Sequence, residues 1–136
     1  MAGDPRSDAP DVIVYVDHSD IHLDHLDELK EGIRHAVALL EEREPQLLAY
    51  GFHLDEDLGR MTVTAVHPDS ASLELHLEVG REEFRKLGAF LTLRNIEVYG
   101  SIGDAVRELL DQKTKMLGGT GVRIVERFDG FARLTR

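Results

Sequence analysis

Seven histidines give this sequence its widest choice of chemistry. A neutral imidazole accepts a proton near pH 7, and it also coordinates transition metals. One group lies among aspartates near the N-terminus, in the order Asp17, His18, Asp20, His22, Asp24 and His25. Two others, His67 and His76, stand on either side of a Pro-Asp-Ser turn. Three interpretations are open for these residues: ordinary solvated turn and cap residues, a proton-transfer site, or a metal site.

The metal interpretation depends on His18, His22 and His25. Their imidazoles and the neighbouring carboxylates are ligand types suited to zinc or another transition metal. The i, i+3 spacing of His22 and His25 would place both on one face of a helix. His18 is expected before that helix begins, and the spacing matches no recognised metal-binding signature. We therefore predict no metal and no other bound cofactor, with these three histidines as the alternative metal ligands.

The elements that would position these side chains begin with a strand, VIVYV, at 12–16, which is apolar on both faces. Residues 17–20 are expected to turn the chain into a first helix that ends before Pro45. The buried stripe of this helix is predicted to contain Leu23, Leu26, Leu29, Ile33, Ala36, Val37 and Leu40. Two further strands, at 47–54 and 60–66, would form a hairpin.

The segment from Arg60 to Leu91 decides the fold, and its pattern is ambiguous. Apolar and polar residues alternate between Leu73 and Val79, which is typical of a half-buried strand. Apolar residues also recur at steps of three or four, as on one face of a helix, at Leu73, Leu77, Gly80, Phe84, Leu87 and Leu91. Good helix formers dominate the composition, and residues 69–72 offer N-cap oxygens, so we predict a helix.

The remainder of the chain adds three elements. A strand is expected at 95–100. A helix should follow from Ser101 or Asp104 to Leu117, where two glycines end it. A last strand is predicted at 122–128, and its alternating pattern completes the order β-α-β-β-α-β-α-β.

This order predicts a ferredoxin-like α+β fold, in which both crossover helices cover one face of an antiparallel sheet. We expect one domain at 11–136, with the βαββαβ core at 11–100 and a helix and strand extension at 101–136. Residues 1–10 are expected to form a disordered tail. The opposite face of the sheet needs a cover, and its apolar content predicts a homodimer joined sheet to sheet. The extension would pack either on its own sheet or on the partner.

The same fold predicts where polar side chains gather. If the first and third strands are parallel neighbours, His18 and His67 share one edge of the sheet. The fourth strand would run antiparallel beside the first and bring Asn95 to that edge. His22 and His76 lie near the starts of the first two helices. A histidine-rich rim is therefore expected at one end of the sheet.

Composition limits the classes of function. The formal net charge of −10 shows no basic face that would bind nucleic acid. Cysteine is absent, which excludes disulfides and thiol chemistry. No apolar run approaches the roughly 20 residues that cross a bilayer, and MAGDPRSDAP lacks the features of a signal peptide. We expect a globular, cytoplasmic protein.

Residues 60–91 resemble the antibiotic biosynthesis monooxygenase (ABM) family, the dimeric α/β-barrel proteins. In that family a third strand precedes a Ser/Asp-initiated helix with an Ala or Leu, then a His-Leu pair, then a Phe. The corresponding residues are Asp69-Ser70-Ala71, His76-Leu77 and Phe84. The resemblance covers roughly residues 11–100. Two departures are the extension beyond this core and the absence of Trp, which many members carry on the third strand.

The resemblance implies oxidation of a small aromatic or quinol-type substrate without a bound cofactor. A base would take a proton from the substrate, which would then react directly with O₂ inside an apolar pocket. His76 or His67 would be the base. The residues expected to bind the substrate are Tyr15, Phe84, Asn95 and Tyr99. The alternative function is a non-catalytic homodimer that binds a small ligand or only mediates association.

Overall fold

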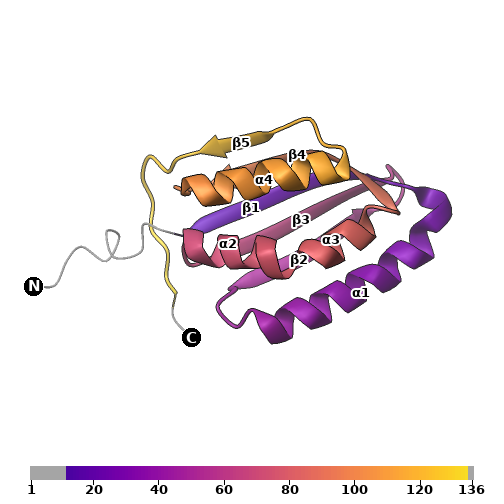
Figure 1. Ribbon diagram of the computed structural model, residues 1–136, viewed down its shortest axis with the longest axis horizontal. Helices are drawn as coiled ribbons and strands as arrows, with labels where there is room; N and C mark the ends of the chain where they lie inside the picture. Colours follow the sequence, from indigo (N-terminus) through magenta and orange to yellow (C-terminus); the bar gives the residue numbers. More distant parts are fainter. Residues whose placement is uncertain (1–11, 135–136) are drawn as a thin grey trace, which may run out of the picture.

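The computed structural model describes residues 12–134, which form a five-stranded sheet with helices over one face (Figure 1). The elements are β1 (Ile13–Ile21), the 3₁₀ turn η1 (Leu23–His25), α1 (Leu26–Arg43), β2 (Ala49–Asp55), β3 (Arg60–His67), α2 (Ser70–Val79), α3 (Arg81–Leu87), β4 (Leu91–Tyr99), α4 (Asp104–Leu117) and β5 (Val122–Val125). The tail predicted at 1–10 lies outside the described residues. None of the helices at 12–134 has the length and hydrophobicity needed to cross a bilayer.

The strand order is β2-β3-β1-β4-β5. The first four strands pair antiparallel, which confirms the ferredoxin-like core. β5 pairs parallel with β4, and α4 packs on β4 and on α2. The extension therefore lies on its own sheet, which decides between the two placements that the sequence left open. Its helix, α4, lies beside α2 and α3 in the same helical layer (Figure 1).

β1 is longer than predicted. Residues 17–20, expected to be a turn, continue the strand and pair with β3 and β4. The prediction was wrong because Asp17 and Ser19 are polar, although they occupy buried positions in phase with Ile13 and Tyr15. A polar residue at a core position hides the period-2 pattern of a strand. The extra length carries Asp17 beneath the helices.

The helix predicted within 60–91 is confirmed, and it is divided at Gly80 into α2 and α3. Asp69 is its N-cap, because the carboxylate accepts a hydrogen bond of 2.8 Å from the backbone N–H of Ser72. A Cβ atom at residue 80 would collide with the ring of Phe84. Glycine at this position therefore lets Phe84 turn back beneath the end of α2.

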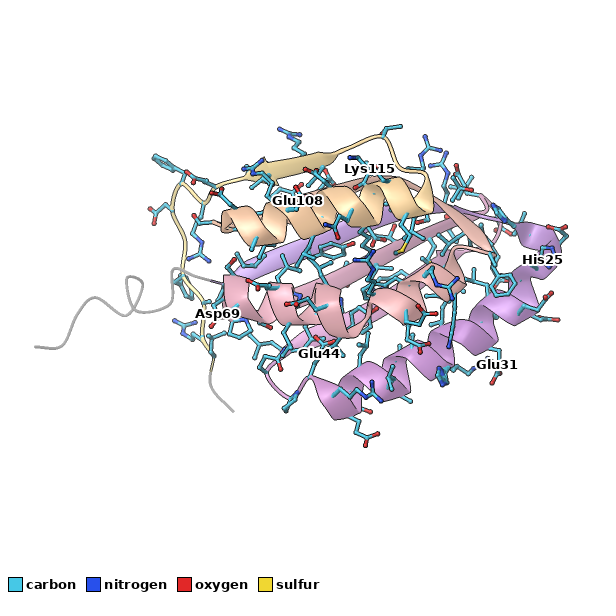
Figure 2. The ribbon with its side chains drawn as sticks, in the orientation of Figure 1. His25, Glu31, Glu44, Asp69, Glu108 and Lys115 are labelled. Carbon is cyan, nitrogen blue, oxygen red and sulfur yellow. The ribbon has the colours of Figure 1, made fainter. Side chains whose placement is uncertain are left out.

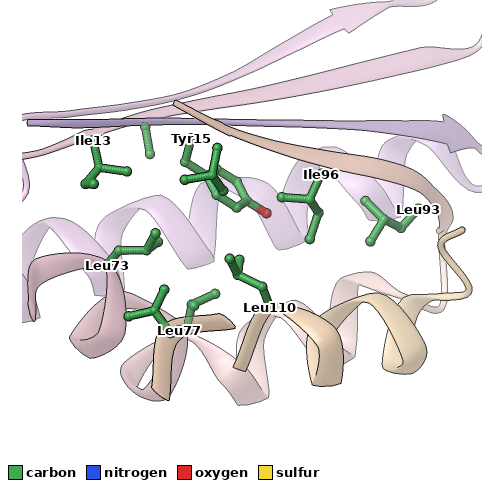
Figure 3. Packing of buried hydrophobic residues seen from close by; sticks show 10 residues of the cluster. Ile13, Tyr15, Leu73, Leu77, Leu93, Ile96 and Leu110 are labelled. Carbon is green, nitrogen blue, oxygen red and sulfur yellow. The ribbon is translucent and has the colours of Figure 1, made fainter. Parts of the chain in front are cut away.

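The core lies between the sheet and the helices (Figure 3). Its larger cluster joins β1 and β4 to α2 and α4 through Ile13, Tyr15, Leu73, Leu77, Leu93, Ile96 and Leu110. Burial of these apolar side chains contributes roughly 1.5–3 kcal/mol each. A second cluster, which includes Leu29, Met61 and Leu87, lies beneath α1 and α3.

The opposite face of the sheet is mixed in character. Val14 is 37% exposed at one end of it. Towards the middle, His18 contacts Glu97 with a ring N–O distance of 3.0 Å, and Tyr99 donates to the same carboxylate at 3.2 Å. The described helices leave this face uncovered (Figure 1). The apolar content expected there is thus limited to part of the face.

The predicted histidine-rich rim is wrong. β1 and β3 are antiparallel, so Ile13 is the partner of His67, whereas His18 is paired with Thr62. The predicted rim required these two strands to be parallel. In a split βαβ unit each crossover joins parallel strands with one antiparallel strand between them. β4 does run antiparallel beside β1, as predicted, and it places Asn95 next to His18, but His67 lies at the other end of the sheet.

Candidate active site

Polar side chains are buried beneath the helices, where apolar packing would be the norm. They form two groups. The histidine cluster consists of the buried Glu44, His67, Ser72 and His76 and the half-buried Gln46. The lysine cluster consists of Tyr15, Asp17 and Lys113. Five elements or loops contribute: β1, the loop after α1, β3, α2 and α4. Buried polar groups need partners, and most of these have them inside their own cluster.

A carboxylate–histidine pair is the centre of the histidine cluster. Glu44, just beyond the end of α1 (Figure 2), accepts from His76 Nδ1 with its two oxygens at 3.0 and 3.1 Å. The two side chains are 0% and 1% exposed. Burial lowers the pKa of His76, although the hydrogen bond to Glu44 acts in the opposite direction. His76 is therefore neutral at pH 7, with its proton on Nδ1 and its lone pair on Nε2.

In His67 the two ring nitrogens have the reverse roles of those in His76: Nδ1 accepts and Nε2 carries the proton. Gln46 donates to Ser72 Oγ at 3.3 Å, so the hydroxyl proton of Ser72 is free to point at His67 Nδ1, 2.8 Å away. Nε2 then carries the ring proton, and it has no hydrogen-bond partner among the described residues. Burial, together with the proximity of His76 and Lys113, lowers the pKa of His67 from 6.5 to about 3. His67 is thus a neutral, unpaired donor.

The rings of the histidine cluster contact the aromatic residues around them. His67 and His76 are 5.2 Å apart between ring centroids, at an angle of 61°. His76 also lies 5.1 Å from Tyr50 and 5.3 Å from Phe84. These contacts fix the orientation of the imidazole that Glu44 holds from its other side. Phe84 and Tyr50 in turn connect this cluster to the lysine cluster.

Lys113 reaches the core from α4. Its Nζ donates to the Tyr15 hydroxyl at 2.8 Å and lies 3.5 Å from Asp17 Oδ2. The hydroxyl of Tyr15 donates to Asp17 at 2.5 Å. Burial raises the pKa of Tyr15 well above 10, and Asp17 raises it further. Burial lowers the pKa of Lys113, an effect that Asp17 opposes.

A small cavity lies between the sheet and the helices. Its volume is about 20 Å³, enough for one water molecule. Its polar lining is Asp17, Ser19 and Lys113, and its aromatic lining is Tyr50, Phe52 and Phe84. Pockets that hold small organic ligands occupy roughly 300–1,000 Å³. An aromatic substrate would therefore enter only when side chains such as Phe84 swing aside.

Four of the predicted site residues lie on the helix-covered side of the sheet. His67, His76, Tyr15 and Phe84 are all at most 4% exposed. Two predicted substrate-binding residues do not face the cavity. Asn95 lines a hollow of about 460 Å³ at the surface that also includes His18, and Tyr99 is 40% exposed and bonded to Glu97. The bulge in β1–β4 pairing after His18 shifts the register there.

The three histidines of the metal alternative do not converge. His22 contacts Thr92 at 2.9 Å, and His25 contacts Glu28 at 3.0 Å. His18 is held by Thr62 and Glu97 on the uncovered face. Within residues 12–134, no three side chains of the metal-binding types come together. Each of these histidines instead has its own local partner.

Glu44 and Lys113 were not predicted as site residues, and Asp17 was considered only as a turn residue beside the N-terminal histidines. Lys113 occupies the apolar stripe of α4, beside Val106 and Leu110, and a lysine at such a position is a signal for a buried cation. Asp17 is in phase with Ile13 and Tyr15, which is a comparable signal. Glu44 precedes a proline and has the sequence context of a solvated helix end. Only its position against α2 shows its role.

Comparison with solved structures identifies the fold. MupZ from Pseudomonas fluorescens superposes with a TM-score of 0.70 at 18% identity, over 91% of this chain and 96% of that one. SnoaB, a cofactor-independent oxygenase from Streptomyces nogalater, gives 0.55 at 15% identity, over 68% and 95%. A structure of an antibiotic biosynthesis monooxygenase gives 0.53 at 21% identity, over 63% and 92%. No protein-family model and no curated protein matches the sequence.

The chain thus has the ABM-like fold that the resemblance of residues 60–91 implied. The match to SnoaB covers 68% of the chain, a length close to that of the 11–100 core. The match to MupZ covers 91% and must therefore include most of the extension with α4. At these identities the likeness concerns the fold. The chemistry has to be argued from the side chains.

Proposed function

We propose that this protein is a cofactor-independent monooxygenase acting on a small aromatic or quinol-type substrate. The observation that carries the proposal is the buried Glu44–His76 pair, which holds a neutral imidazole next to aromatic residues of a core cavity. A histidine positioned by a carboxylate is suited to general-base catalysis. The ABM-like fold, shared with the cofactor-independent oxygenase SnoaB, supports the same reaction class.

In the proposed reaction, His76 Nε2 takes the hydroxyl proton of a phenol. The resulting anion is electron-rich enough to react directly with O₂. A phenol with a free para C–H becomes a quinone, one oxygen atom enters the ring, and the other leaves as water. The substrate supplies all four electrons, so the balance requires no further reductant.

His67 would serve as a hydrogen-bond donor to the substrate. Its Nε2–H is buried and unpaired, and an unsatisfied buried donor costs about 1–3 kcal/mol. An anionic oxygen placed against it would remove this cost during the reaction. With a pKa of about 3, the ring stays neutral and does not compete with His76 for the substrate proton. The two histidines thus have complementary roles in the proposal.

Oxygen uptake tests the proposal. Wild-type protein is expected to consume O₂ with at least one member of a panel of phenols and naphthohydroquinones. His76→Gln retains a donor for Glu44 but lacks the base, and it should lower kcat/KM by at least about 100-fold. His53→Gln, at an exposed histidine of β2, is the matched control and should leave the rate unchanged. A panel without enzymatic uptake, or equal rates for wild type and His76→Gln, would contradict the assignment.

The second candidate is a non-catalytic homodimer that binds a small ligand. The observation that favours it is the uncovered face of the sheet, where Val14 remains 37% exposed. Packing sheet to sheet would bury this residue together with Val16 and Val66. Sedimentation at micromolar concentration should show a dimer under either candidate function. A dimer without oxygen uptake on the whole panel would favour this second candidate.

A further inference from the structure

We propose that Lys113 binds an anionic oxygen of the ligand, so that the site selects aromatic compounds carrying a phenolate or a carboxylate. This inference rests on the proposed function for the location of the site. It goes further in naming the charge of the ligand and in assigning the recognition to the C-terminal extension, outside the core that resembles the ABM family.

The ammonium group of Lys113 has a donor available for a ligand. A lysine has three N–H donors. One is given to the Tyr15 hydroxyl at 2.8 Å, and Asp17 lies 3.5 Å away. On another side, Nζ lies 4.0 Å from the centroid of the Phe84 ring. An aromatic face is a weaker partner for an N–H than an anionic oxygen is, so this side is the one that a ligand anion would occupy.

Lys113 is also positioned to contact a ligand. Together with Phe84 it lines the inner cavity and also a surface depression between α3 and α4. These two side chains therefore form the boundary between the inner cavity and the outer depression. Arg81 lies at the outer depression, where its Nη1 donates to Gln112 Oε1 at 3.1 Å. A ligand that enters by displacing Phe84 would pass Arg81 and then contact Lys113.

One carboxylate opposes the binding of an anion beside Lys113. The titratable groups facing Lys113 or the cavity are Asp17 and Tyr15 on β1, Tyr50 on β2, His67 on β3, His76 on α2 and Arg81 on α3. Asp17 is the anionic member of this set, and it already accepts a hydrogen bond from Tyr15. An anion beside Phe84 would share the ammonium with Asp17 and would meet the neutral His76 ring.

The probe for this inference is 4-nitrophenol, whose anion is yellow. A cation at the site favours the anion, so binding to wild-type protein should lower the pKa of the probe by about one unit. This shift corresponds to about tenfold tighter binding of the anion than of the neutral phenol. Lys113→Arg keeps the cation and should keep the shift. Lys115→Met, on the exposed side of α4 (Figure 2), should leave the shift intact.

The reference variant is Asp17→Asn/Lys113→Met, which removes both buried charges, with its fold checked by circular dichroism. It should bind the probe without lowering its pKa. A shift of equal size in this variant, an absent or upward shift in wild type, or no saturable binding at millimolar probe would overturn the inference. Benzoate distinguishes the two ligand types: displacement of the probe shows that the site accepts carboxylates, and no displacement restricts it to phenolates.

This readout is independent of oxygen consumption. A lowered probe pKa in a protein that consumes no O₂ would remove the oxygenase proposal and retain the anion site. Oxygen uptake with unchanged KM in Asp17→Asn/Lys113→Met would retain the oxygenase and remove the anion site.

Discussion

Replacing Lys113 with Met is expected to lower the free energy of unfolding by about 3–5 kcal/mol. The reason is the carboxylate of Asp17, which is 4% exposed and would remain in the core without its cation. Removing one partner of a buried ion pair is far more destabilising than removing both. The measurement is urea unfolding followed by circular dichroism at pH 7.

A double variant that also removes Asp17, the other member of the ion pair, tests this explanation. Adding Asp17→Asn to Lys113→Met should recover more than half of the lost stability, because no uncompensated charge is then buried. Lys115→Met, an exposed lysine on the same helix, should change stability by no more than about 0.5 kcal/mol. If Lys113→Met and Lys115→Met cost the same, the buried ion pair does not contribute as described.

Acid is expected to destabilise the protein through His67. Its folded pKa of about 3 lies below the usual 6.5, so between these values the unfolded chain binds a proton that the folded chain does not. Stability should therefore fall by about 1.4 kcal/mol for each pH unit below 6.5, until pH 3 is reached. Above pH 6.5 this contribution is constant. The lowered pKa of His76 adds a loss of the same sign.

The measurement that checks this is the free energy of unfolding as a function of pH, in wild type and in His67→Gln. This variant has no imidazole to protonate, so its slope between pH 6 and pH 4 should be smaller than that of wild type by about 1.4 kcal/mol per unit. His53→Gln changes an exposed histidine and should keep the wild-type slope. An identical slope in wild type and His67→Gln would show that His67 is solvated in solution.

The order of elements was predictable because local patterns determine it. The apolar stripe of 70–87 and the N-cap at Asp69 identified the helix, and glycine at 118 marked the end of α4. The ferredoxin-like arrangement then followed from the connectivity. The direction of β1 relative to β3 was misassigned, and this error alone moved His67 to the wrong end of the sheet.

The chemistry of the site was predictable only in part, since it depends on partners distant in sequence. His76 and Phe84 were identified from a short motif, and both lie beside the cavity or its aromatic wall. Asp17 was taken for a turn residue because a buried carboxylate makes sense only with Lys113 in view. Glu44 has the sequence context of a solvated helix end, and only its partner on α2, 32 positions away, shows that it is buried.

The contact between Lys113 and Tyr15 joins residues separated by 98 positions. Until α4 docks, the strand that starts the sheet carries a carboxylate in its core with no counter-ion. A folding intermediate that contains only the βαββαβ unit is therefore unfavourable, although this unit has the element order of a complete fold. Contacts of such long sequence separation slow folding, because a large loop must close before they form. The last helix thus makes folding cooperative from one end of the chain to the other.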